Sequence, residues 1–130
     1  MSTRCNIHFV EDGRLAANIY RHSDGYPDGP NGVPADLARF FKAVEEQTDD
    51  HRFDDAEYLA GKFVVWQAGE NASDCDLVKG KWVHSNHSKE RPLDFLGLGI
   101  CHRDHGDIEF TYTVDCGDLD SNGHPTVTWT

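Results

Sequence analysis

The chain has 130 residues, 38% of them hydrophobic and 11% aromatic, a composition typical of one folded domain and not of a disordered chain. It carries 12 Lys and Arg against 23 Asp and Glu, and this formal net charge of -11 argues against direct binding to the backbone of DNA or RNA. The longest apolar runs are too short to span a membrane, and the N-terminus lacks the pattern of a signal peptide, so we expect a cytoplasmic protein.

The acidic charge has two interpretations. The first is that the charge attracts a basic protein partner. The second is that the charge only keeps the protein in solution. The four cysteines have no C-x-x-C spacing, which argues against a zinc ribbon and a thioredoxin motif, and we expect reduced thiols and no cofactor. They are Cys5, Cys75, Cys101 and Cys116.

Two strands are predicted at the start of the chain, over Thr3 to Val10 and Leu15 to His22, with a three-residue loop at 11–13. Such a loop pairs Phe9 with Leu15, Ile7 with Ala17 and Cys5 with Ile19, which gathers the apolar residues on one face. The opposite face carries a polar row made of Arg4, Asn6, His8, Asn18, Tyr20 and His22. Most polar sheet faces hold no ligand, but this one would form a shallow pocket if the long polar segment from Gly69 to Asp94 folded over it.

A stretch rich in Gly, Pro, Asp and Asn follows, from Tyr20 to Val33, and it predicts a stiff, irregular loop. His22 and Asp24 place an imidazole and a carboxylate two residues apart, a pair that could bind a metal, a sugar hydroxyl or a nucleotide base. Tyr26 adds a phenol nearby. The alternative is structural: Asp24 forms an Asx turn before a glycine, His22 bonds a backbone carbonyl, and Tyr26 packs.

Two amphipathic helices are predicted next. The first begins at Pro34, which suits the first position of a helix, and ends near Gln47. The second begins at Asp54, whose spacing to Glu57 resembles a capping box, and its apolar stripe is Leu59, Phe63 and Trp66.

The segment from Gly69 to Asp94 is polar, with a strand-like pair only at 82–83. A second hairpin is predicted over Leu96 to Arg103 and Asp107 to Val114, with its loop at 104–106 and Arg103 facing Asp107, and a last strand over Thr126 to Trp129. The predicted fold is a single α+β domain over residues 1–130. It has an antiparallel sheet of about five strands, with two helices packed on one face.

Motifs for catalysis are sparse. Cys101 and His102 are neighbours in a strand and point to opposite faces, so they cannot form a thiolate-imidazole pair without a bulge. No nucleophile elbow is present, and Cys75 lies between two carboxylates that disfavour its thiolate. A metal site joining His84 or His87 to His22 or Asp24 stays open.

One resemblance adds to this reading. From Tyr20 to Pro27 the chain reads YRHSDGYP, after a start that reads TRCNIHF from Thr3 to Phe9. This part of the chain resembles uncharacterised bacterial and bacteriophage proteins that carry a Tyr-x-(His or Gln)-x-Asp-Gly-Tyr-Pro segment. The resemblance covers roughly the first forty residues. It implies a compact cytosolic protein of phage or mobile-element origin and brings no activity with it.

We therefore expect a non-enzymatic binding module whose acidic surface engages a basic protein, such as a phage inhibitor of a host nucleic-acid-binding system. The alternative is a small-ligand or metal site at the loop of His22 and Asp24, which sequesters a nucleotide-like molecule or hydrolyses it with a metal-activated water. The residues expected to bind a ligand are His8, Asn18, Tyr20, His22, Asp24 and Tyr26.

Overall fold

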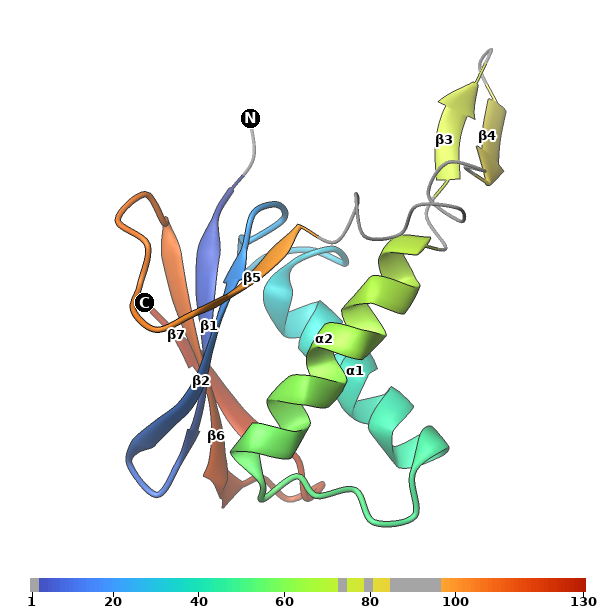
Figure 1. The fold of residues 1–130 in the computed structure, drawn as a ribbon. Helices are drawn as coiled ribbons and strands as arrows, with labels where there is room; N and C mark the ends of the chain where they lie inside the picture. Colours follow the sequence, from blue (N-terminus) through green and yellow to red (C-terminus); the bar gives the residue numbers. More distant parts are fainter. Residues whose placement is uncertain (1–2, 73–74, 79–80, 85–96) are drawn as a thin grey trace.

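The computed structural model describes residues 3–72, 75–78, 81–84 and 97–130, and it shows an α+β fold (Figure 1). The elements in chain order are β1 (Cys5–Glu11), β2 (Arg14–Arg21), α1 (Val33–Gln47), α2 (Ala56–Ala72), β3 (Cys75–Val78), β4 (Lys81–His84), β5 (Leu98–Cys101), β6 (Phe110–Leu119) and β7 (Pro125–Trp129). Five strands form one sheet in the order β5-β2-β1-β6-β7, and β3 and β4 pair separately. Both helices lie on the same side of the five-stranded sheet in Figure 1.

The five-stranded sheet is mixed, so the prediction of an antiparallel sheet is wrong. β1 pairs antiparallel with β2 but parallel with β6. The predicted second hairpin does not form either, because β5 pairs with β2 while β6 pairs with β1 and β7. The pairing of β6 with β1 sets Tyr112 beside Ile7 and Val114 beside Phe9, all fully buried. Burial against a central strand removes more apolar surface from water than an isolated hairpin could.

The first hairpin forms with a register that differs from the predicted one by two residues. Its turn is only Asp12-Gly13, with φ of 51° and 78°, the positive angles that a tight two-residue hairpin turn requires. A bulge between Phe9 and Val10 in the pairing then restores the alternation, so that Phe9 lies opposite Ala17. The polar face therefore carries the predicted residues, and so does the apolar face apart from Leu15, which pairs with Val10 beyond the bulge and is 50% exposed. The individual partners differ from the predicted ones.

The helices begin near the predicted positions. α1 starts at Val33 with a proline in its first turn. α2 starts at Ala56, two residues later than predicted, and the Asp55 carboxylate accepts a hydrogen bond from the Tyr58 amide at 3.2 Å. The Glu11 carboxylate accepts another from the Ala56 amide at 2.9 Å, so β1 helps to cap this helix. The carboxylates that bond these amides are therefore Asp55 and Glu11, and not the Asp54 and Glu57 of the predicted capping box. One of them comes from a distant strand.

The helices pack on the face of the sheet that carries the odd-numbered residues of β1. The rings of Phe9 and Phe63 lie 5.7 Å apart, and the ring of Phe63 meets that of Phe40 edge-on at 5.3 Å. The buried core also takes in one ion pair, in which the Arg21 guanidinium lies 2.6 Å from the Asp36 carboxylate. This pair ties the end of β2 to α1, because removing Asp36 would leave the Arg21 guanidinium buried without a counter-charge, whereas Asp36 also pairs with Arg39.

The turn-rich segment after β2 is fixed to the sheet through Gly25. Its amide donates to the Thr3 carbonyl at 2.9 Å, and its carbonyl accepts a bond from the Tyr112 hydroxyl at 2.7 Å. A Cβ at position 25 would lie 2.8 Å from the Thr3 oxygen and 2.9 Å from the Cys5 Cβ. Glycine is thus required by space, and the segment has a structural role.

We predict that Gly25→Ala destabilises the protein by about 1–3 kcal/mol, because the added methyl group meets backbone and a buried side chain. Gly61→Ala is the matched control. It lies in α2 with nothing within 4 Å of the added Cβ, and we expect it to stabilise by up to about 1 kcal/mol. Urea unfolding of the three proteins measures both changes. Equal stability of Gly25→Ala and the wild type would contradict the close approach.

Candidate functional site

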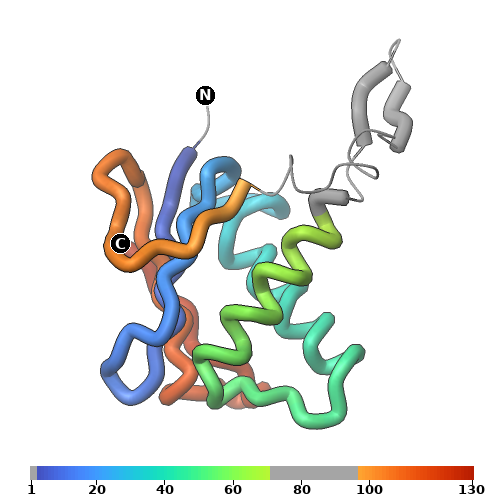
Figure 2. The backbone as a smooth tube through the Cα atoms, in the orientation of Figure 1, coloured from blue at the N-terminus to red at the C-terminus, as the bar shows by residue number. Residues whose placement is uncertain are grey.

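Residues 102–109 join β5 to β6 and cross the outer face of the sheet, away from the helices; we call this segment the crossover. Its path follows from the register, because β5 and β6 are separated by β2 and β1 and run in the same direction. The chain must therefore return over those two strands, and Figures 1 and 2 show it passing in front of them. The Glu109 amide donates to the Arg4 carbonyl at 2.9 Å, which fixes the far end.

The crossover is bonded to the polar face through Asp104. Its Oδ1 atom lies 2.6 Å from His8 Nε2 and accepts a bond from Asn18 Nδ2 at 2.8 Å. The His8 side chain is 21% exposed and that of Asp104 48%, so the imidazole is covered while the carboxylate is at the rim. The hydrogen bond from His8, with a smaller contribution from Asn18, lowers the pKa of the Asp104 carboxyl.

A second contact is aromatic. The His105 ring stacks on the Tyr20 ring with centroids 4.0 Å apart and planes 14° from parallel. The Tyr20 hydroxyl also lies 3.1 Å from His22 Nδ1, and Arg4 Nε donates to the same nitrogen at 3.4 Å. The crossover thus places a ring and a carboxylate on two neighbouring parts of the polar face.

Asn6 is the unusual residue of this face. It lies opposite Tyr20 on one side and Thr111 on the other, two residues before His8. Its side chain is 0% exposed, yet neither Nδ2 nor Oδ1 has a hydrogen-bond partner among the described residues. Asn18 Oδ1 is also buried without a partner. A buried polar group without a partner costs about 1–3 kcal/mol, so these unpaired side-chain atoms call for an explanation.

The predicted site residues are divided by the structure. His8, Asn18, Tyr20 and His22 share the polar face. Asp24 adopts a left-handed φ of 56° and accepts a bond from the Tyr26 hydroxyl at 3.4 Å. It borders a separate small recess with Arg21 and Asp36, and no described hydrogen bond or ion pair joins it to His22. The Tyr26 hydroxyl has a raised pKa, through desolvation first and the neighbouring Asp24 second.

Sequence reasoning placed Asn6 on this face but not among the ligand-binding residues, and it missed Asp104 and His105. The sequence pattern places the two crossover residues at a hairpin tip, and the segment that it offers as a cover for the face is 69–94. Only the parallel pairing of β1 with β6 brings the crossover over the face. Residues 73–74, 79–80 and 85–94 of that segment, including His87, lie outside the described residues, as does the side chain of His84.

The two buried cysteines, Cys5 and Cys116, offer little nucleophilic chemistry. Burial raises the pKa of the Cys5 thiol to about 12, and burial likewise raises that of Cys116 to about 12, so both stay protonated at neutral pH. Cys5 and Cys116 belong to the core on the helix side of the sheet. Within the described residues no group of three or more His, Cys, Asp or Glu side chains is arranged to hold a metal ion.

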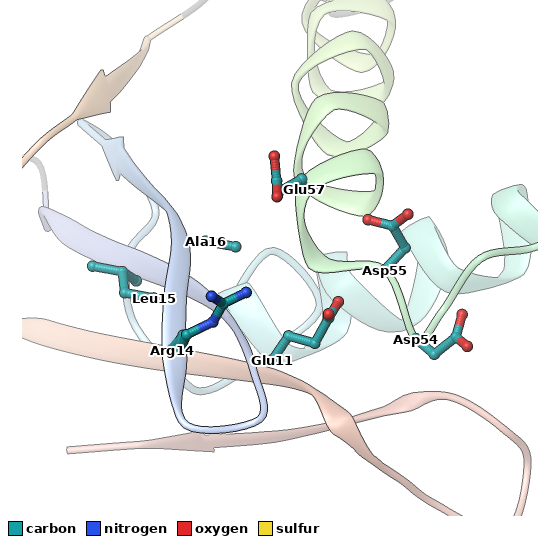
Figure 3. Close-up of a pocket in the computed structure, with 7 residues that line it drawn as sticks. All are labelled: Glu11, Arg14, Leu15, Ala16, Asp54, Asp55 and Glu57. Carbon is teal, nitrogen blue, oxygen red and sulfur yellow. The ribbon is translucent and has the colours of Figure 1, made fainter.

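An acidic recess of about 660 Å³ lies between the first hairpin and the start of α2 (Figure 3). Four carboxylates border it, with Arg14 on the hairpin side. Two of them already serve the helix, because Glu11 and Asp55 accept bonds from its first amides. The carboxylates are Glu11, Asp54, Asp55 and Glu57.

Comparisons with protein-family models, with curated proteins and with solved structures find no match to this chain. In the described part of the chain, no helix has both the length and the apolar character needed to cross a membrane. The site must therefore be interpreted from its own geometry.

The Asp104 contacts predict a pH dependence of stability. Folding lowers the pKa of the Asp104 carboxyl. The ionised carboxylate therefore stabilises the folded state fully at pH values above its pKa in the unfolded chain, about 3.9, and this stabilisation is lost as the pH falls through the pKa of the folded state. Asp104→Asn should be less stable than the wild type at pH 6, by under about 1 kcal/mol because the carboxylate is half exposed. Urea unfolding should show this difference shrinking toward pH 3. A difference that grows with acidity would contradict the assignment.

Proposed function

We propose that the protein is a non-enzymatic binding module and that its binding site is the polar face beneath the crossover. The observation that carries this proposal is the fully buried Asn6 carboxamide with no partner for its donor or its acceptor. Domains are stable by only about 5–15 kcal/mol, so two unsatisfied amide atoms at about 1–3 kcal/mol each are a considerable cost. A bound ligand that pairs with both atoms would recover it.

The surroundings of Asn6 support binding better than catalysis. The neighbouring imidazole of His8 and the amide of Asn18 already hold a carboxylate, and Tyr20 already holds a ring. Desolvation, with the nearby Asp107 charge, raises the pKa of the Tyr20 hydroxyl, so it remains a neutral hydrogen-bonding group. These are groups that position a molecule through hydrogen bonds and stacking.

The proposal predicts that Asn6→Leu increases the stability of the ligand-free protein by about 1–3 kcal/mol, because leucine has a similar shape and no unsatisfied polar atom. Asn18→Leu is the matched control. It also removes a buried unsatisfied oxygen, but it loses the bond to Asp104, so we expect no gain. Urea unfolding measures both variants. Destabilisation by Asn6→Leu would mean that the amide is satisfied in the free protein, and the proposed site would fail.

The acidic recess supports a second candidate function, the binding of a basic protein. The net charge of -11 would steer such a partner toward the chain, and the recess is large enough to take a lysine or arginine side chain. If the chain comes from a phage, an inhibitor of a host nucleic-acid-binding protein would fit this charge. We rank it second because exposed ion pairs contribute only about 0–1 kcal/mol each.

Charge reversal tests the basic partner. Asp54→Lys with Glu57→Lys changes two exposed recess residues, and Glu46→Lys with Asp49→Lys makes the same net change elsewhere on the surface. Binding of an arginine-rich peptide should weaken about tenfold or more for the recess variant relative to the control variant, a difference of about 1.4 kcal/mol. Equal weakening in fluorescence anisotropy would show a net-charge effect without a specific recess.

A further inference from the structure

The crossover occupies the polar face in the free protein, and its contacts indicate what chemistry the face accepts. The His105 ring stacks on Tyr20 at 4.0 Å, and one Asp104 carboxylate oxygen takes bonds from His8 and Asn18. A planar ring and an anionic group are therefore held by adjacent residues. The unpaired Asn6 is a neighbour of both positions, since it lies opposite Tyr20 on the next strand and two residues from His8 on its own.

The Asn6 carboxamide adds a requirement of its own. A carboxamide presents one acceptor and two donor hydrogens in a plane, and it pairs with an edge that carries a donor beside an acceptor. Nucleobases have such edges, and adenine is the base that asparagine pairs with in two hydrogen bonds. The unpaired Asn18 oxygen offers a further acceptor nearby.

We propose that the ligand of this face is nucleotide-like, a planar nucleobase joined to an anionic group, and that it binds by displacing the crossover. The base stacks on Tyr20 in the place of His105 and pairs through its edge with Asn6. The anionic group replaces the Asp104 carboxylate on His8 and Asn18. This inference rests on the proposed function and names the class of ligand.

The displacement explains how a fully buried amide can serve as a binding residue. The crossover residues are exposed except for the half-buried Ile108, and none of them belongs to the hydrophobic core on the helix side. The crossover can therefore move away from the polar face without opening that core. The crossover then competes with the ligand, and the apparent dissociation constant equals the intrinsic one divided by the fraction of molecules with the face open. Weakening the crossover must tighten binding.

Isothermal titration calorimetry with adenosine 5′-monophosphate tests the inference on the full chain. We expect His105→Ala to bind about threefold or more tightly than the wild type, because the competing ring is gone. We expect Asn6→Leu to bind about tenfold or more weakly. His102→Ala is the matched control, an exposed crossover histidine without a described contact to the polar face, and its affinity should equal that of the wild type.

Related probes separate the parts of the ligand. Adenosine lacks the anionic group, ribose 5-phosphate lacks the ring, and purine riboside 5′-monophosphate lacks the exocyclic donor, so each should bind more weakly than adenosine 5′-monophosphate. Equal binding of ribose 5-phosphate would show an anion site alone and overturn the inference. So would a lack of binding by both the wild type and His105→Ala. If binding is absent but Asn6→Leu stabilises the protein, the proposed binding face is retained and its ligand belongs to another chemical class. If Asn6→Leu destabilises the protein, the proposed function is overturned as well.

Discussion

The parallel pairing of β1 with β6 is the constraint on which the candidate site depends. Parallel neighbours cannot be joined by a tight turn, and here β2 and β5 fill the opposite side of β1, so the chain from β5 can reach β6 only by crossing the sheet. The helices occupy one face, and the crossover takes the other. Asp104 and His105 come to lie over polar residues of β1 and β2 for this reason.

β1 combines two different environments in one strand. Its odd-numbered residues, such as Ile7 and Phe9, are fully buried against the helices, which supplies apolar burial worth about 1.5–3 kcal/mol for each side chain. Its even-numbered residues lie on the opposite face, where His8 contacts the crossover and Asn6 is buried just as completely without a hydrogen-bond partner among the described residues. The burial of the core offsets this cost, so an amide that weakens the free protein can persist, as the proposed binding role of Asn6 requires.

The sequence by itself determined the local structure and the two faces of the first hairpin. Strand alternation placed Asn6, His8 and Tyr20 on one side in both the predicted and the observed register, because the two registers differ by two residues over this part of the hairpin. Pro34 and the apolar spacing after it located α1 to within one residue. These features depend on residues that are close together in the sequence, within one helix or strand and its flanking turn. Hydrophobic periodicity and turn residues describe this range.

Only the tertiary structure decided which strands became neighbours and what covered the polar face. The segment from β5 to β6 contains an Asp-His-Gly tip that suits a hairpin, and its local pattern fits that hairpin as well as it fits a crossover. The crossover forms instead of the hairpin because Tyr112 and Val114 are buried beside β1, a strand about one hundred residues earlier in the sequence. The partners of Arg21 and Ala56 are likewise distant. Long-range burial has no signature in a local sequence pattern, so the site beneath the crossover could be recognised only in the folded chain.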